Sequence, residues 1–398
     1  MHCRSVGVTG TNGKTTTATW IAAALAASQP PVFLATTLGY FVGDAQLTPR
    51  VDDGYVGFLD AATEASAKGA RLAAVELTSQ ALWSGVARAW PCEVGVFTNL
   101  SYDHLDAHGD AEHYLASKAQ LFLALPPGGC AVLNGCDEAF ELLREIVPAH
   151  ARVLTYGHPR RGSVRADLDL RVTHTRVAWS GTTLTLAGRV VGETERGSLH
   201  VRAIGDVFAE NAAAALLGAC AMGVPFEVAA AAMADAPAPP GRFEVVATSP
   251  HVVVDYAHTP DALARMCTTA GRLAKQGRGT LTVVFGAGGN RDPGKRAPMG
   301  RAARSADRVI VTTDNPRDED PAAIAQAVVG GLSRHAGLDI ELDRRRAITR
   351  AVHDAGPRDV ILVCGKGHET EQIARGATTC FSDREVALEA VASRRLRR

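Results

Sequence analysis

The sequence has no net charge, because its 42 lysine and arginine residues are matched by 42 aspartate and glutamate residues. Such a chain has no bulk electric field that would attract nucleic acid or an anionic membrane. It also has no uninterrupted apolar run of about 20 residues, the length of a membrane-spanning helix, and no signal-peptide pattern near its start. We therefore expect a soluble cytoplasmic protein that binds neither nucleic acid nor membranes.

Metal-binding cysteine spacing is missing as well. The eight cysteines form no Cys-x-x-Cys pair and stand at no metal-type spacing from a histidine; they are Cys3, Cys92, Cys130, Cys136, Cys220, Cys267, Cys364 and Cys380. Cysteines of this kind are typical of a reduced compartment, where they pack as small apolar side chains. We therefore expect no disulfide framework and no cysteine-based metal site.

The length of the chain indicates two domains. Its 398 residues exceed the roughly 100 to 200 residues of one ordinary domain. The segment Asp-Ala-Pro-Ala-Pro-Pro-Gly at 235–241 places three prolines ahead of an apolar, strand-length run, which is typical of a domain boundary. We predict a first domain at 1–238 and a second at 239–398.

The hydrophobic pattern predicts an α/β fold in both domains. In the first domain, strand-length apolar runs alternate with helical stretches, which favours a mostly parallel sheet, and short alternating segments between 153 and 201 indicate a small antiparallel insertion. In the second domain the alternation restarts, which predicts a Rossmann-like open α/β sheet. The predicted strands are 71–77, 93–100, 130–134, 178–186, 198–203, 251–255, 280–285, 308–312 and 359–364, and the predicted helices include 18–27, 111–125, 208–222 and 225–234.

A glycine-hinged run, Thr-Gly-Thr-Asn-Gly-Lys-Thr-Thr at 9–16, lies between a short strand end and an alanine-rich helix. In a phosphate-binding loop (P-loop), backbone N–H groups surround the phosphates, a lysine neutralises their charge and a threonine hydroxyl ligates Mg²⁺. Lys14 and Thr15 stand at the positions for these two roles. The usual G-x-x-x-x-G-K-[ST] spacing fails because residue 8 is valine, and the shorter match alone arises by chance about as often as by function.

Further polar residues follow other strands of the first domain, at the edge where open α/β sheets bind ligands. Glu76 ends one strand, either as a Mg²⁺ ligand or as an ordinary surface carboxylate. The next strand runs into a cluster that contains His104 and His108, each as compatible with a capping role as with a ligand. By pattern alone, Lys118 on the following helix is an ordinary helix lysine.

In the second domain four strands each end in a polar turn. The turns are Asp-Tyr-Ala-His-Thr-Pro at 255–260, Gly-Ala-Gly-Gly-Asn-Arg-Asp at 286–292, Thr-Asp-Asn-Pro-Arg at 313–317 and Gly-Lys-Gly-His-Glu at 365–369. Glycines allow close approach of the backbone, arginines bind carboxylates through two hydrogen bonds, and a glutamate can hold an ammonium group. Ordinary turns explain any one of these segments, but four in succession favour a pocket for a zwitterion.

Taken together and in order, these motifs resemble the Mur ligases, and among them the type that adds the third amino acid of the peptidoglycan stem peptide. The resemblance runs from Val6 nearly to the C-terminus. It rests on the run at 9–16, on Phe-Thr-Asn-Leu-Ser-x-Asp-His-Leu-Asp at 97–106, Asp-Tyr-Ala-His-Thr-Pro-Asp-Ala-Leu at 255–263, Asp-Asn-Pro-Arg at 314–317, Gly-Lys-Gly-His-Glu at 365–369 and Phe-Ser-Asp-Arg at 381–384. It implies an ATP-dependent amide ligase: the acceptor carboxylate attacks the γ-phosphate, and an amine then displaces phosphate from the acyl phosphate.

The resemblance also implies roles for individual residues. The family's catalytic positions match Lys14, Glu76, His104 and Lys118, and Lys118 matches the lysine that the family carbamylates. Two Mg²⁺ sites are implied, with ligands among Thr15, Glu76, His104 and the carbamylated Lys118. ATP contacts are implied for Gly10, Thr11, Asn12, Gly13, Lys14, Thr15, Thr16, Asn211, Arg242 and Asp255.

The incoming amino acid is implied by the second domain. Its matching positions are Arg291, Asp314, Asn315, Arg317, Gly365 and Glu369. Arginine in Asp-Asn-Pro-Arg is the variant associated with meso-diaminopimelate, whose second carboxylate gives Arg317 a bidentate partner. The resemblance therefore implies diaminopimelate or a close analogue as the amine substrate.

The acceptor side departs from the family pattern. The family's domain for the uridine diphosphate, which precedes the phosphate loop, is absent from this sequence. Thr78, Ser79 and Gln80 stand where the family has Ser-Ser-His, and Val86 stands where an arginine contacts the acceptor, with Arg88 two residues away. These departures lead us to expect a small peptide or amino-acid acceptor other than the standard UDP-muramoyl dipeptide.

Two alternatives stay open. In the first, the chain joins diaminopimelate to the standard UDP-muramoyl dipeptide, with or without a separate acceptor-binding partner. In the second, it is a non-catalytic, nucleotide-responsive binding module. The last is the weaker, because Lys14, Glu76, His104 and Lys118 are all present.

Overall fold

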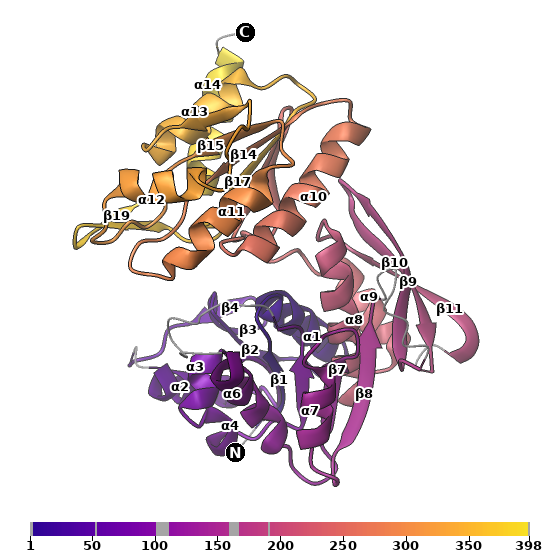
Figure 1. Ribbon diagram of the computed structural model, residues 1–398. Coiled ribbons are helices and arrows are strands. Elements are labelled where there is room, and N and C mark those ends of the chain that lie inside the picture. The colour runs from indigo at the N-terminus through magenta and orange to yellow at the C-terminus, as the bar shows by residue number, and fades with distance from the viewer. Residues whose placement is uncertain (1–2, 52–53, 101–110, 159–166, 190–191, 397–398) are drawn as a thin grey trace. The chain divides into compact units, whose positions relative to one another are not determined.

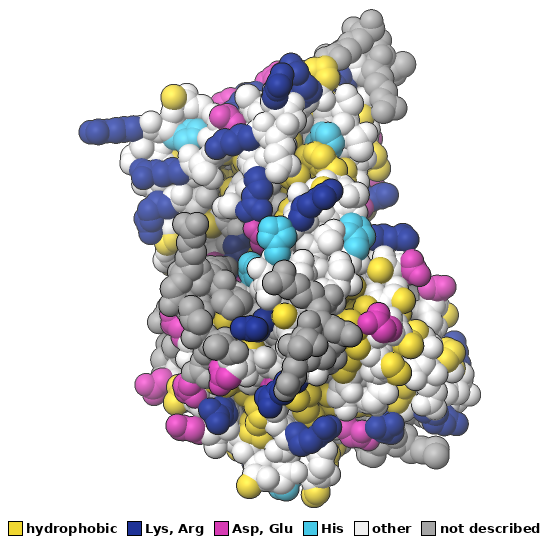
Figure 2. All heavy atoms as spheres, turned by 90° about the vertical axis from the view of Figure 1, so that its right-hand side faces the viewer, with side chains coloured by type: hydrophobic (Ala, Val, Ile, Leu, Met, Phe, Trp, Pro, Cys, Tyr) yellow, Lys and Arg dark blue, Asp and Glu magenta, His cyan; other side chains and the backbone are white. Residues whose placement is uncertain are grey.

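Two strand-and-helix alternations, one on each side of the proline-rich segment at 235–241, fold into separate units, Met1–Pro237 and Ala238–Arg398 (Figure 1). The computed structural model describes residues 3–51, 54–100, 111–158, 167–189 and 192–396. Within these residues no helix has the length and apolar character needed to cross a membrane. Both signs of charge lie interspersed on the face shown in Figure 2.

The first unit is built on one sheet of eleven described strands in the order β11-β10-β9-β8-β7-β6-β1-β5-β2-β3-β4. Its middle strands are parallel, and antiparallel hairpins extend it at both edges. The strands are β1 Arg4–Thr9, β2 Val32–Thr36, β3 Gly39–Val42, β4 Ala45–Leu47, β5 Leu72–Glu76, β6 Val94–Phe97, β7 Cys130–Asn134, β8 Arg152–Gly157, β9 Leu170–Ala178, β10 Gly181–Gly188 and β11 Gly192–Val201. The mostly parallel sheet with an antiparallel insertion is thus confirmed.

The helices of the first unit cover this sheet. They are α1 Lys14–Ser28, α2 Gly54–Ala67, α3 Ser79–Trp83, α4 Val86–Ala89, α6 Ala111–Leu123, α7 Phe140–Ile146, α8 Asp206–Ala221 and α9 Phe226–Asp235. The helix α8 carries alanine at 212–215, and these four side chains are fully buried. A helix that is apolar on every side is buried on every side, so α8 packs closely against both α1 and the strands.

One predicted strand of the insertion is wrong at its start. The sequence favoured a strand at 178–186, but Ala178 ends β9 and the next strand begins at Gly181. Gly181 has a φ of 132°, a backbone conformation open to glycine but strained for other residues. Trp179 and Ser180 form the hairpin turn between β9 and β10. The alternation of apolar and polar residues continues through this turn, so the pattern did not mark it.

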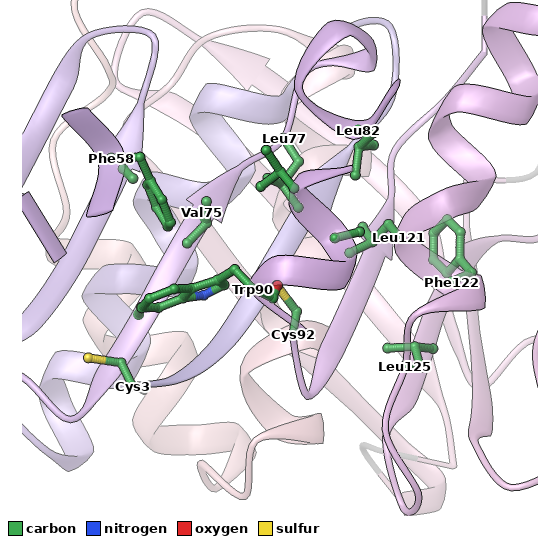
Figure 3. Packing of buried hydrophobic residues seen from close by; sticks show 14 of the residues in the cluster. Cys3, Phe58, Val75, Leu77, Leu82, Trp90, Cys92, Leu121, Phe122 and Leu125 are labelled. Carbon is green, nitrogen blue, oxygen red and sulfur yellow. The ribbon is translucent and has the colours of Figure 1, made fainter. Parts of the chain in front are cut away.

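The core beneath the sheet centres on Trp90, which follows α4. Its ring meets that of Phe58 edge-on, with 5.0 Å between centroids, and lies among Cys3, Val75 and Cys92 (Figure 3). The indole nitrogen donates a hydrogen bond to Ser5 Oγ at 3.1 Å. This bond satisfies the one polar atom of the ring, as burial of tryptophan requires.

The second unit holds a sheet of six described strands in the order β12-β13-β17-β14-β15-β16, parallel except at β12. Its strands are β12 Glu244–Thr248, β13 His251–Asp255, β14 Leu281–Phe285, β15 Arg308–Val311, β16 Leu338–Ile340 and β17 Val360–Cys364, with the separate hairpin β18 Glu371–Ala374 and β19 Ala377–Cys380. Its helices are α10 Pro260–Gln276, η1 Pro293–Lys295, α11 Arg296–Ala303, α12 Pro321–Val329, α13 Arg344–Asp354 and α14 Asp383–Leu396. The predicted open α/β sheet is confirmed.

A buried ion pair joins α13 to α14 in this unit. Arg344 donates two hydrogen bonds of 2.7 Å to Asp383, and both side chains are fully buried. The same guanidinium donates to the carbonyl of Thr313, just past β15, at 3.2 Å and to the carbonyl of Cys364, which ends β17, at 2.8 Å. One cation thus ties two strand ends to the last helix.

We predict that Asp383→Ala destabilises the second unit by about 3–5 kcal/mol, because it leaves the Arg344 guanidinium buried without its counter-ion. The matched control is Glu389→Ala, which breaks the ion pair that Arg345 makes between the same two helices at the surface. This control is expected to cost about 1 kcal/mol or less. Urea unfolding followed by far-ultraviolet circular dichroism measures both, since all four tryptophans lie in the first unit. Equal losses of stability in the two variants would contradict the assignment.

Candidate active site

The predicted phosphate loop connects β1 to α1, in the middle of the first sheet. Gly13 precedes the helix with a φ of 85°, a conformation that favours glycine, and provides no side-chain cap. Gly10 has a φ of 144°, and a Cβ atom there would lie 1.9 Å from Thr98 Oγ1. Both glycines are therefore required by the shape of the loop, which suits phosphate binding at a helix N-terminus.

The residues just past β6 hold the loop in place. The Thr98 hydroxyl donates to the carbonyl of Asn12 at 2.7 Å. The Asn99 amide oxygen accepts from the Asn12 N–H at 3.0 Å, and the Asn99 carbonyl accepts from the Thr11 N–H at 2.7 Å. The sequence placed Thr98 and Asn99 in a polar cluster without giving them a role, because this role depends on β6 lying next to β1.

Two lysines converge on one carbonyl of the loop. Lys14 Nζ donates to the carbonyls of Gly10 at 3.1 Å and Thr11 at 2.9 Å. Lys118 Nζ donates to the same Gly10 carbonyl at 3.0 Å and lies 4.0 Å from the centre of the Tyr114 ring. Lys118 is only 1% exposed, so it is not the ordinary helix lysine that the pattern of α6 suggests. Two cations beside the N-terminus of α1 form a site for an anion.

A carboxylate and two hydroxyls meet beside the loop. Glu76, at the end of β5, accepts hydrogen bonds at Oε2 from Thr15 Oγ1 at 2.8 Å, Thr37 N at 3.2 Å and Thr37 Oγ1 at 3.4 Å. Carboxylate and hydroxyl oxygens are the ligands that Mg²⁺ prefers. Thr37 belongs to none of the motifs recognised in the sequence, and it lies next to Glu76 because β2 pairs with β5.

His104, the other predicted metal ligand of this region, lies outside the described residues. Among the residues that the structure does describe, no three histidine, cysteine, aspartate or glutamate side chains gather as a metal site. The described oxygen donors near the loop, Thr15 and Glu76, are of the kind that Mg²⁺ prefers.

The remaining predicted nucleotide residues divide between the two units. In the first, Thr16 is buried in α1. Asn211 on α8 lies against the loop, since a Cβ atom at Gly13 would come within 2.2 Å of Asn211 Oδ1.

The other two, Arg242 and Asp255, lie in the second unit around the end of β13. The Arg242 guanidinium lies over the Tyr256 ring, 4.5 Å from its centre. Asp255 accepts hydrogen bonds from Phe243 N at 2.7 Å and Ala257 N at 2.6 Å. Burial raises the pKa of the Asp255 carboxyl above its ordinary value, and Arg242 and these two N–H groups oppose the rise. Asp255 therefore holds two neighbouring backbone segments together.

The predicted amine-binding residues gather at the ends of β14, β15 and β17, which are neighbours in the second sheet. Asn315 Nδ2 donates to Glu369 Oε2 at 3.1 Å. Gly365 has a φ of 118° and lies so close to Asp314 that a Cβ atom would come within 2.4 Å of its Oδ2. Segments 54 residues apart in the sequence are thus in direct contact.

The two predicted arginines of this site flank Gly288. A Cβ atom there would lie 3.3 Å from Arg317 Nη1 and 3.6 Å from Arg291 Cγ. Arg317 Nη1 donates to the carbonyl of Gly289 at 2.8 Å. The Arg317 N–H donates to the carbonyl of Ile373 at 3.0 Å, so the hairpin β18–β19 holds this segment.

The acceptor candidates lie on and before the short helices α3 and α4, which follow β5. Thr78 caps α3 by accepting from Ala81 N at 3.1 Å, Ser79 is buried and Gln80 is exposed. Arg88 is exposed on α4. Thr78 thus has a structural role as a helix cap two residues after Glu76.

The Mur ligase middle domain matches residues 8–219, and the Mur ligase glutamate ligase domain matches residues 241–367. UDP-N-acetylmuramoyl-L-alanyl-D-glutamate–2,6-diaminopimelate ligase of Thermosynechococcus vestitus is 38% identical over 99% of this chain and 78% of its own length. The enzyme of the same name from Chromobacterium violaceum is 40% identical over 97% of this chain and 76% of its own length.

Solved structures agree with these matches. A structure of a UDP-N-acetylmuramoyl-L-alanyl-D-glutamate–2,6-diaminopimelate ligase superposes with a TM-score of 0.68 at 32% identity, covering 99% of this chain and 79% of its own. Mycobacterium tuberculosis folylpolyglutamate synthase complexed with ADP gives a TM-score of 0.71 at 20% identity, covering 99% of this chain and 90% of its own, which shows a shared fold.

The chain therefore belongs to the Mur ligase family, and the resemblance found in its motifs is confirmed. It is an ATP-dependent ligase that forms carbon–nitrogen bonds, in a family that uses ATP and Mg²⁺.

We predict that Gly10→Ala weakens ATP binding by about 10- to 100-fold. The added methyl group would meet Thr98 Oγ1, and the displacement of the loop that avoids this clash would cost about 1–3 kcal/mol. The control is Gly43→Ala in the turn between β3 and β4, which also has a positive φ, of 58°, but has open space around it. Isothermal titration with ATP measures both variants. Wild-type affinity in Gly10→Ala would show that the loop contact is unimportant for the nucleotide.

Proposed function

We propose that the chain joins meso-diaminopimelate to the glutamate carboxylate of UDP-N-acetylmuramoyl-L-alanyl-D-glutamate, at the expense of ATP. The observation that carries the proposal is the similarity to ligases of that name over nearly the whole chain. The arginine-containing turn at 313–317 and the phosphate loop supply chemistry that suits this amine and ATP.

The standard acceptor is better supported than the changed acceptor that the sequence favoured. That expectation depended on the missing nucleotide domain and on Val86 in place of an arginine. The relatives that carry the standard acceptor in their names are 38% and 40% identical over 99% and 97% of this chain, a span that includes Thr78 and Arg88. The changed acceptor therefore becomes an outcome of the test below.

The first chemical step places negative charge on the transferred phosphoryl group, which the loop is suited to stabilise. Lys14 and the N-terminal end of α1 supply positive potential where the acceptor oxygen attacks. Thr15 and Glu76 would hold Mg²⁺, which shields phosphate charge when bound. The acceptor carboxylate becomes an acyl phosphate, and ADP leaves.

The second step joins the amine to the acyl phosphate. Arg317 offers a bidentate partner to a carboxylate, and Glu369 offers a negative partner to an ammonium group. The amino acid would thus be held by its charged ends while one neutral nitrogen attacks the acyl carbon. Phosphate leaves, and the nitrogen loses a proton.

Phosphate release with ATP and Mg²⁺ tests the proposal across two acceptors and two amines. The acceptors are UDP-N-acetylmuramoyl-L-alanyl-D-glutamate and the unattached dipeptide, and the amines are meso-diaminopimelate and L-lysine, which lacks the second carboxylate. We expect turnover with the nucleotide acceptor and a kcat/KM for diaminopimelate about 10- to 100-fold above that for lysine, the effect of a hydrogen bond to a charged group.

Each other outcome of this matrix excludes part of the proposal. Equal turnover with the unattached dipeptide would establish the changed acceptor. Equal use of lysine would remove the role given to Arg317. No phosphate release with any pair would favour the nucleotide-responsive binding module.

We also propose that Lys118 is carbamylated in the active enzyme. Its buried Nζ lies beside the loop, where a carbamate would provide an anionic bridge between two Mg²⁺ ions. Lys118→Ala is expected to abolish ligation, with partial recovery on addition of formate or acetate, which replace the missing carboxylate. The exposed Lys68→Ala is the control. Activity that survives in Lys118→Ala would refute the role, and so would a loss that no carboxylate restores.

A further inference from the structure

Lys366, in the turn after β17, is a charged side chain with no exposed surface. Its Nζ donates to Asn315 Oδ1 at 3.0 Å and to Glu369 Oε2 at 3.2 Å. A buried ammonium group is costly unless it is paired and hydrogen-bonded, and these two partners satisfy that need. Both partners belong to the set assigned above to the incoming amino acid.

The contact fixes which way the Asn315 amide faces. Its oxygen accepts from Lys366 Nζ and from Ile373 N at 3.0 Å, which uses both acceptor positions. The reversed amide would place its NH₂ group against two donors. Asn315 Nδ2 is therefore directed to Glu369, and of its two N–H groups the hydrogen bonds of the described residues use one.

The same contact divides the two oxygens of Glu369. Oε2 accepts from Lys366 and from Asn315, whereas Oε1 accepts no hydrogen bond from the described residues. The Glu369 side chain is 34% exposed, in contrast to fully buried Lys366. One carboxylate oxygen is thus fixed within the protein, and the other remains available for a substrate ammonium group.

We propose that Lys366 is a positioning residue for the amine substrate. It turns the Asn315 amide so that an N–H group faces the site, and it holds Glu369 so that Oε1 receives the ammonium group. Lys366 itself does not touch the substrate. This inference rests on the proposed amine site, and it adds to that site a residue that affects how well the amino acid binds without touching it.

The test is Lys366→Met, which keeps the length of the side chain and removes its donors and its charge. We expect the KM for diaminopimelate to rise about 10- to 100-fold, as for lost hydrogen bonds to charged groups, with the KM for ATP unchanged. The exposed Lys275→Met at the end of α10 is the control and should leave both constants unchanged. An unchanged KM for the amine in Lys366→Met would overturn the proposal.

A mutant cycle separates positioning from a general loss of structure. If Lys366 acts through Asn315 and Glu369, adding Lys366→Met to a variant that already carries Asn315→Ala and Glu369→Gln should raise the amine KM much less than it does in the wild type. A full effect in both backgrounds would overturn the proposal. If Lys366→Met does not fold, Lys366→Gln retains a donor for one partner only and should still raise the amine KM; no rise would count against the proposal.

Failure of the proposed function is distinguishable from failure of this inference. The wild type is first assayed with the panel of amines described above. If it uses another amino acid, the assignment of diaminopimelate fails, and the Lys366 variants are then measured with that amino acid. If it uses diaminopimelate and Lys366→Met binds it normally, only the inference fails.

Discussion

The shape of the phosphate loop depends on its contact with the end of β6. Thr98 and Asn99 use a hydroxyl, an amide and a carbonyl to hold two consecutive loop residues, Thr11 and Asn12, and Gly10 leaves room for the hydroxyl only because it has no side chain. With the loop held this way, the Gly10 carbonyl accepts hydrogen bonds from the ammonium groups of Lys14 and Lys118. The position of these two ammonium groups therefore depends on a contact between uncharged groups, that of Thr98 and Asn99 with the loop.

The two units apply one principle to different ligands. In each, neighbouring parallel strands bring their carboxyl ends to one edge, and polar side chains that are distant in sequence meet there. In the second unit, buried cations then fix the arrangement: Arg344 joins two strand-end carbonyls, and Lys366 joins the side chains of Asn315 and Glu369. Such interior charges contribute a defined geometry more than net stability.

The sequence predicted the fold class and most elements correctly because their hydrophobic patterns are local. β7 and β13 match the predicted strands at 130–134 and 251–255 residue for residue. The site was only partly predictable. Lys118 has the spacing of a surface lysine, and its burial follows from where α6 packs. The roles of Thr37 and Lys366 arise from contacts across 39 and 51 residues, which no local pattern contains.

The backbone of Arg317 connects amine specificity to the stability of the fold. Its φ of 51° is unfavourable for arginine and is held by hydrogen bonds to Ile373 and Arg375 of the hairpin. Asparagine or glycine would adopt this conformation at less cost, so a mutation that removes the charge also relieves strain. In the role proposed for Arg317, the residue that would select for a second carboxylate is thus also one that costs the fold stability.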